Sequence, residues 1–276
     1  MFGHTPAKVK ISVVTPSLNQ ARFISQSISS VIEQQGDFDV ELFVMDGGSS
    51  DGTVEILKEY ERKIGRLETS RISLSWKSEK DMGQAQAINQ GLRLSRGQVL
   101  AFLNSDDTYA PGALQRVADF FRRNPGLLWL TGKCRIINAQ GREIRKGVTA
   151  YKNFWLRHYC YPLLLAENFL SQPATFWRRG LYEEFGELEE NCHYSLDYEY
   201  WLRLGEKYRP GFIDEYLANF RVHPESKGGR GEKLRWGDGL DLIRRYGRPY
   251  GYILPLYLFN YVKMASAFRL LRWLGR

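Results

Sequence analysis

Residues 40–53 read VELFVMDGGSSDGT, an apolar run that ends in an acidic, glycine-rich turn. The first six residues predict a buried β-strand, and the glycines after Asp46 mark the turn that ends it. Residues 54–64 then predict a helix. This strand–turn–helix order recurs on both sides of the quoted stretch.

Further strands are predicted at 10–15, 72–76 and 99–103, and further helices at 21–34, 84–94 and 111–123. Strands that alternate with helices imply parallel pairing, so the fold class is α/β with an open, doubly wound sheet. The pattern is less regular beyond residue 128. There we expect strands at 129–138 and 212–222, a helix at 197–204, and a domain boundary near residue 235.

Composition is that of an ordinary globular protein: 276 residues, 43% hydrophobic and 25% charged. It excludes a disordered chain, a collagen-like repeat and a small disulfide scaffold. The three cysteines lack metal-ligand spacing, and residues 1–10 hold no apolar signal segment, which favours a reducing, cytoplasmic compartment. The longest apolar run, 250–262, is shorter than the ~20 residues of a spanning helix.

The net charge of +8 favours anionic partners, namely nucleic acid, anionic lipid or phosphorylated ligands, but does not choose among them. Position is more informative. Three polar segments, 15–19, 46–53 and 104–107, each follow a predicted strand. Ligands of such sheets bind outside the carboxyl ends of the strands, so we expect these segments to converge on one crevice.

Asp106 and Asp107 are adjacent acids directly after a predicted buried strand. Paired carboxylates suit a hard divalent cation such as Mg²⁺ or Mn²⁺, and substrate phosphates commonly complete its coordination. An Asx turn before the helix that starts near Pro111 explains the pair equally well. Asp51 is interpreted as a cap of the helix that follows it, which leaves Asp46 at the strand end without a structural explanation.

The segment 197–201 holds two acids two residues apart. On a helix they point about 200° apart, so only one of them can face a given site. Glu199 shares its face with Arg203, which predicts a surface ion pair, and Asp197 shares its face with Trp201. We therefore favour Asp197 as the functional acid and expect the single His223 to be structural.

Five motifs occur in an order that resembles the family 2 glycosyltransferases over roughly residues 8–225. They are Thr15-Pro-Ser-Leu-Asn19, Asp46-Gly-Gly-Ser-Ser-Asp-Gly-Thr53, Glu79-Lys-Asp-Met-Gly-Gln84 with Ala87-Ile-Asn89, Leu103-Asn-Ser-Asp-Asp107 and Asp197-Tyr-Glu-Tyr-Trp201. The resemblance implies a GT-A fold: a Rossmann-like, mixed and mainly parallel sheet, an irregular acceptor region and a helical C-terminal extension. It implies a nucleotide-sugar-binding half at 1–127, an acceptor-binding half at 128–235 and the extension at 236–276.

The activity that the resemblance implies is inverting transfer of a sugar from a nucleotide-diphosphate sugar, UDP- or dTDP-linked, to an acceptor hydroxyl in polysaccharide or glycolipid assembly. Carried over by position, the donor-binding residues are Thr15, Pro16, Asp46 on the base, Asp81, Gly83, Gln84 and Asp106 near the ribose. Asp107 would hold Mn²⁺ or Mg²⁺ on the diphosphate, Asp197 would be the general base, and Gln172 and Trp201 are assigned to the acceptor. Asn104 departs from the pattern, because a strict Asp-x-Asp motif has its first acid there.

The C-terminal residues suggest a membrane partner. On a helix, Arg269, Arg272 and Arg276 fall within about 60° of one another, with leucines on the other side. This pattern is typical of an interfacial helix on an anionic membrane, where a lipid-linked saccharide acceptor would lie. A helix packed on the catalytic domain fits equally well.

Two other functions remain as alternatives. A nucleotidyltransferase that makes the nucleotide-sugar would carry a glycine-rich loop with Arg and Lys after the first strand, whereas residues 15–20 read TPSLNQ. A basic nucleic-acid-binding module would interleave cations with aromatic residues. Acids at the strand ends repel phosphates, so no nucleic acid partner is expected.

Overall fold

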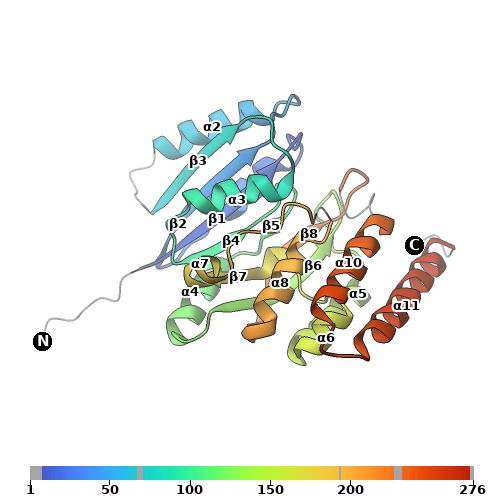
Figure 1. Ribbon diagram of the computed structural model, residues 1–276. Coiled ribbons are helices and arrows are strands. Elements are labelled where there is room, and N and C mark those ends of the chain that lie inside the picture. The colour runs from blue at the N-terminus through green and yellow to red at the C-terminus, as the bar shows by residue number, and fades with distance from the viewer. Residues whose placement is uncertain (1–7, 67–70, 193, 227–231, 274–276) are drawn as a thin grey trace, which may run out of the picture.

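The computed structural model describes residues 8–66, 71–192, 194–226 and 232–273, which form an eight-stranded sheet flanked by helices (Figure 1). The strands are β1 (Val9–Ser17), β2 (Phe38–Asp46), β3 (Ile72–Ser78), β4 (Val99–Phe102), β5 (Thr108–Tyr109), β6 (Trp129–Ile137), β7 (Thr175–Arg178) and β8 (Gly211–Arg221). The helices are α1 (Ile24–Ile32), α2 (Thr53–Gly65), α3 (Gln84–Leu94), α4 (Ala113–Arg123), α5 (Lys146–Arg157), α6 (Tyr161–Ala166), η1 (Gln172–Ala174), α7 (Arg179–Phe185), α8 (Leu196–Lys207), α10 (Glu232–Tyr246) and α11 (Ile253–Trp273).

The strand order is β3-β2-β1-β4-β7-β6-β8-β5. Strands β1 to β4 are parallel, as predicted, and β8 is parallel to β6. Strand β7 is antiparallel to both β4 and β6, so β6 and β8 run in the direction of β4. The carboxyl ends of β1 to β4, β6 and β8 therefore lie along one edge of the sheet.

Strand β1 runs through Pro16, although the sequence predicted a break there. The Val14 carbonyl accepts Leu103 N–H on the β4 side, so the nitrogen of Pro16, two residues on, points to that same side. There β4 has already ended at Phe102. The missing N–H of proline therefore removes no ladder hydrogen bond.

Two apolar clusters hold the helices on the two faces of the sheet. One contains Ile24 of α1, Leu57 of α2 and Val117 of α4. The other contains Ile88 of α3 and Trp201 of α8, together with residues of α6, α7, α10 and α11. The doubly wound arrangement expected from the alternation of elements is confirmed.

The C-terminal extension joins this second cluster. Ile243 of α10 and Ile253 and Tyr257 of α11 are buried, and the Tyr246 hydroxyl donates to Glu199 of α8 at 2.6 Å. The predicted division at residue 235 therefore separates segments that share one core. The side chains of Arg269 and Arg272, and all of Arg276, lie outside the described structure.

Candidate active site

Asp46 organises the turn that follows β2. Its carboxylate accepts hydrogen bonds from Ser49 N–H at 2.8 Å, Gly48 N–H at 3.2 Å and the Ser78 hydroxyl at 2.6 Å. The Ser49 hydroxyl donates to its second oxygen at 2.5 Å. Both oxygens are therefore held by protein donors, and contact with a nucleotide base stays a prediction for this residue.

Asp51 joins the same turn to the loop after β1. One oxygen accepts Thr53 N–H at 3.1 Å at the start of α2, and the other accepts Ala21 N–H at 2.9 Å. The N-cap of α2 is Gly52 rather than the predicted Asp51, which lies one residue earlier. Asn19, at φ 53°, accepts Ser50 N–H through its side chain at 3.0 Å. The first two polar segments are thus bonded to each other.

The segment before α3 closes over this turn. Asp81 packs against Gly47, where a Cβ would lie 2.8 Å from its Oδ2, and accepts Gly83 N–H at 2.9 Å. On the facing strand, the hydroxyls of Thr15 and Ser17 are buried and have no hydrogen-bond partner among the described residues. Buried hydroxyls without partners are uncommon in folded proteins, and these two lie at the carboxyl end of β1.

A chain of side-chain amides leads from α3 to the acid pair. Gln84 Nε2 donates to Asn104 Oδ1 at 2.6 Å, and Asn104 Nδ2 donates to Gln172 Oε1 and Asp107 Oδ2, both at 3.3 Å. Gln172 Nε2 donates in turn to the Phe102 carbonyl. The structure therefore brings Gln84, Gln172 and Asp107 together at the end of β4, and buried Gln172 bridges protein groups here.

The two adjacent acids differ in their surroundings. Asp107 is fully buried, and its Oδ1 accepts Arg221 N–H at 2.7 Å. Burial, together with the neighbouring Asp106 charge, raises the pKa of Asp107 well above its usual range. The Asp106 side chain is 17% exposed, and its Oδ2 lies 3.0 Å from His223 Nε2.

Arg221 connects several segments at the carboxyl edge of the sheet through hydrogen bonds. Its guanidinium is buried and donates to the Asp106 carbonyl at 2.7 Å, to Gln26 Oε1 at 2.8 Å and to the carbonyls of Asn138 and Ala139 at 3.2 Å. It also stacks on Phe23, with 4.8 Å between the guanidinium carbon and the ring centroid. Arg221 was not among the predicted site residues, and His223 was expected to be structural; the position of both at the end of a predicted strand was the available signal.

The acid pair offers few ligands to a divalent cation. Among the described residues, no group of three or more His, Cys, Asp or Glu side chains is arranged to hold a metal ion. Mg²⁺ often takes only one or two carboxylates and completes its coordination with substrate phosphates and water. Partly exposed Asp106 fits that requirement, whereas both oxygens of enclosed Asp107 already accept protein hydrogen bonds.

The two acids of α8, Asp197 and Glu199, differ in burial. Asp197 is half-buried in the first turn and accepts Tyr198 N–H at 2.8 Å. Glu199 forms the predicted pair with Arg203 at 2.8 Å, but the pair is not on the surface, because Glu199 is buried. Its structural role is as expected.

The assignment of Trp201 to the acceptor is wrong. The indole is fully buried and stacks on Trp129 with ring centroids 5.8 Å apart. It packs edge-on against Trp177 as well. An aromatic residue at helical spacing is here a core residue, and no ligand reaches it.

This fold and site define a class of protein, the GT-A glycosyltransferases. One solved structure with that fold is S. aureus TarS 1–349 in complex with UDP-GlcNAc; its TM-score is 0.65 at 17% identity, and the match covers 90% of this chain and 71% of that one. Another is the mannosyltransferase PcManGT of Pyrobaculum calidifontis in complex with GDP-Man and Mn²⁺; its TM-score is 0.64 at 17% identity, and the match covers 94% of this chain and 76% of that one. The match spans 39% of a longer TarS chain.

Sequence comparison narrows the class to one family. The model of glycosyl transferase family 2 matches residues 12–181. The putative teichuronic acid biosynthesis glycosyltransferase TuaG of Bacillus subtilis is 31% identical over 217 residues, which are 78% of this chain and 80% of that protein. The chain belongs to glycosyl transferase family 2, and it is a glycosyltransferase.

Proposed function

We propose that the protein transfers a sugar from a UDP- or dTDP-linked donor to an acceptor hydroxyl, with inversion, in the assembly of a cell-surface polysaccharide or glycolipid. The observation that carries this proposal is the network of Asp106, Asp107, Arg221 and His223 at the carboxyl edge of the sheet. The relatives named for teichuronic acid synthesis and solved with UDP-GlcNAc support a UDP-sugar and a polymeric acceptor.

In this proposal the donor lies along the ends of β1 to β4. Thr15 and Pro16 border the nucleotide, Asp46 and Asp81 hold the turns beside its base, and Gly83 and Gln84 lie near the donor.

Asp106 is partly exposed and Asp107 is fully buried, so we assign the metal ion to Asp106 instead of Asp107. Asp106 would hold Mn²⁺ or Mg²⁺ with the donor diphosphate, and that cation would offset the charge that grows on the leaving group. Asp107 would keep Asn104 and the end of β8 in place. The relative solved with Mn²⁺ supports use of a divalent cation.

Asp197 is proposed as the general base. It takes the proton of the acceptor hydroxyl, whose oxygen attacks the anomeric carbon from the side opposite the diphosphate. The bond from that carbon to the diphosphate breaks as the new glycosidic bond forms, which inverts the configuration. The half-buried position of Asp197, at the start of α8, supports access to an acceptor.

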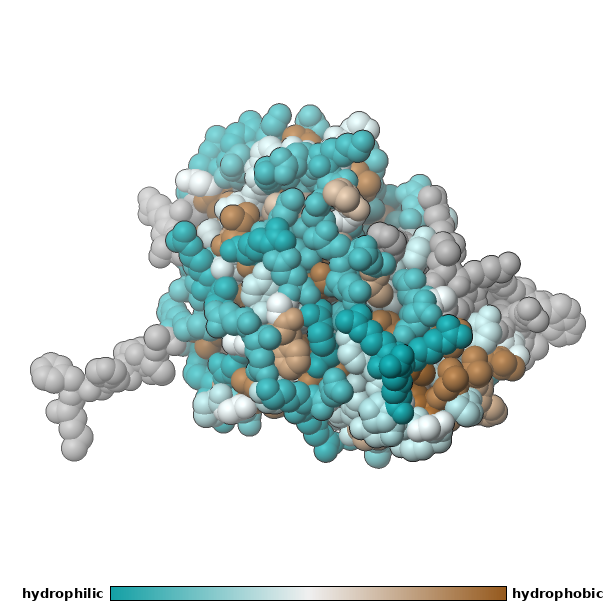
Figure 2. All heavy atoms as spheres, in the orientation of Figure 1, coloured by the Kyte–Doolittle hydropathy of each residue, from teal (hydrophilic) through white to brown (hydrophobic). Residues whose placement is uncertain are grey.

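The outer face of α11 supports the proposed membrane association. Leu254, Leu258, Phe259 and Val262 are 40–66% exposed, and Figure 2 shows apolar surface gathered over this part of the molecule. Within the described residues, no helix is both long enough and apolar enough to cross a bilayer. We infer that α11 lies in the membrane interface, with its inner side, at Ile253 and Tyr257, on the core.

Vesicle flotation tests this part of the proposal. The wild type should float with phosphatidylglycerol vesicles, and Phe259→Ser combined with Val262→Ser should reduce the floating fraction severalfold. Leu94→Ser on α3, 54% exposed in the wild type, is the matched control and should float normally. Equal flotation of all three proteins, or none by the wild type, would refute the membrane assignment.

Donor binding is tested by thermal shift with UDP-, dTDP- and GDP-sugars, with and without Mn²⁺. A ligand that binds only the folded state raises its stability. We expect Mn²⁺-dependent stabilisation by a UDP- or dTDP-sugar that Asp106→Asn removes and that Asp241→Asn, an exposed acid on α10, retains. Absence of stabilisation by every nucleotide-sugar would contradict the proposed function.

A further inference from the structure

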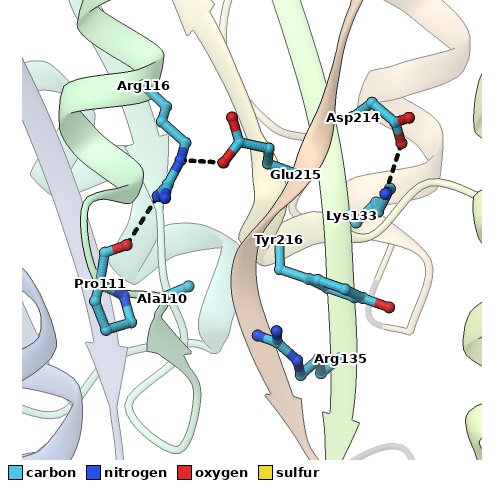
Figure 3. A pocket seen from close by; sticks show the side chains of 8 residues that line it. All are labelled: Ala110, Pro111, Arg116, Lys133, Arg135, Asp214, Glu215 and Tyr216. Carbon is cyan, nitrogen blue, oxygen red and sulfur yellow. Dashed lines mark hydrogen bonds and ion pairs between the residues drawn. The ribbon is translucent and has the colours of Figure 1, made fainter.

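A hollow of about 330 Å³ lies beside the second half of the sheet (Figure 3). Strand β6 contributes Lys133 and Arg135, and β8 contributes Asp214, Glu215 and Tyr216. The connection from β5 to α4 closes the remaining side with Ala110, Pro111 and Arg116. Its volume is at the lower end of the range for small-molecule sites, ~300–1,000 Å³.

The two acids of the hollow are already neutralised. Glu215 pairs with Arg116 at 2.5 Å, and Asp214 pairs with Lys133 at 2.7 Å, as the dashed lines in Figure 3 mark. Arg157 of α5 is a second cation on Asp214, at 2.9 Å. With Arg135, four cations surround two carboxylates, so the hollow is positively charged.

Arg135 is the cation of the hollow that is not paired with either acid. Among the described residues its guanidinium has no ion pair and no hydrogen-bond acceptor, although the residue is half-buried. It stacks on the Tyr216 ring, with the guanidinium carbon 3.9 Å from the ring centroid, and Lys133 Nζ lies 5.6 Å from that centroid. No anionic group among the described residues pairs with this half-buried guanidinium, so it can bind a carboxylate or phosphate without first breaking an ion pair.

The stack also prepares Arg135 for a planar acid. A guanidinium on an aromatic face keeps its N–H groups free at its edges, where they match two oxygens of a carboxylate or phosphate. The Tyr216 hydroxyl accepts from Asn153 of α5 at 3.5 Å, which fixes the ring from its far end. The cation is thus oriented before any ligand arrives.

The hollow is close in the fold to the acid pair. Arg135 is in register with Asn219 of β8, and Asn219 donates to the Thr108 hydroxyl at 3.1 Å. Thr108 directly follows Asp107. We propose that this hollow binds an anionic group of the acceptor saccharide, a uronate carboxylate or a phosphodiester, through Arg135 stacked on Tyr216. The anion site itself rests on the geometry alone, and its assignment to the acceptor rests on the proposed function.

Isothermal titration calorimetry with two anionic oligosaccharides tests the site, one built of glucuronate and one linked by phosphodiesters. The carboxyl-reduced glucuronate oligomer is the neutral probe. The wild type should bind one anionic oligomer at least tenfold more tightly than the neutral probe, and whichever binds identifies the anion. Arg135→Gln should weaken this binding at least tenfold, and Tyr216→Leu should weaken it as well.

Arg123→Gln removes an exposed arginine of α4 and is the matched control, which should bind like the wild type. The melting temperature of Arg135→Gln should stay close to that of the wild type, because the variant loses the contact with the Tyr216 ring but no ion pair or hydrogen bond. Binding of neither anionic oligomer, equal binding of the neutral probe, or equal weakening by Arg123→Gln would overturn the proposal. Nucleotide-sugar binding, measured in parallel, reports separately on the proposed function.

Discussion

Replacement of Arg221 by lysine separates the charge at the sheet edge from the hydrogen bonds that the guanidinium makes. The wild-type guanidinium donates to the Asp106, Asn138 and Ala139 carbonyls and to Gln26 Oε1, all from one planar group. A lysine keeps the positive charge beside the acid pair but offers one ammonium group, which reaches only part of this set.

The expected loss follows from the groups left without a donor. The four acceptors are partly buried or exposed, so each one that loses its partner costs ~0.5–1.5 kcal/mol. Two or three lose theirs, so we expect Arg221→Lys to lower the free energy of unfolding by ~1–4.5 kcal/mol. At ~2–4 °C per kcal/mol for a chain of this size, the melting temperature should fall by roughly 2–18 °C.

Urea denaturation and thermal melting measure this loss, with Arg123→Lys as the matched control. Arg123 is exposed, so its replacement should change stability by less than ~0.5 kcal/mol. A loss below ~1 kcal/mol for Arg221→Lys would refute the claim that this guanidinium fastens the edge. Donor binding by the folded variant should also weaken, because Asp106 loses the support of its carbonyl.

Three further predictions concern the acid pair, the base and the core. Because the pKa of Asp107 is raised, the folded state binds the proton of this carboxyl more tightly than the unfolded state does. The free energy of unfolding should therefore fall as the pH rises above ~3.9, the pKa of an unfolded aspartate. Thermal melts from pH 4 to 8 should show a shallower fall for Asp107→Asn than for the wild type. Asp197→Asn should lower kcat by ~10²–10⁴ with donor affinity unchanged in calorimetry, and an unchanged kcat would remove Asp197 from the mechanism. Gly91→Ala places a Cβ 2.4 Å from Val14 Cγ1, so urea titration should show ~1–3 kcal/mol of destabilisation; a neutral effect would contradict the tight packing of α3 on β1.

The first half of the fold could be predicted from the sequence because each of its elements has a strong local pattern. Helix α3 was predicted at 84–94, the bounds that it has. Strands β5 and β7 were missed because they have two and four residues and are defined by their partners on β4, β6 and β8. Helices α5, α6 and α7 lie between residues 139 and 196, where no helix was predicted.

The site residues at strand ends could be predicted from the sequence, whereas most contacts between them could not. Asp106 and Asp107 were found from their position, but their difference in burial depends on β8, which is more than a hundred residues away in sequence. Arg221 and His223 reach the acids only through that long-range contact. Trp201 was misassigned because helical spacing cannot tell a face on the core from a face on a ligand.

The amide chain at the end of β4 explains why residue 104 is an asparagine. The chain ends on the Phe102 carbonyl, which can only accept, so all three amides point one way and Asn104 must present its Nδ2 to Gln172 and Asp107. An aspartate at 104 would bring a third carboxylate against a buried one and offer no hydrogen to either neighbour. The asparagine at position 104 is therefore what allows Asp107 to be enclosed. If position 104 were an aspartate, as in a strict Asp-x-Asp motif, the surroundings of Asp107 would have to open to water.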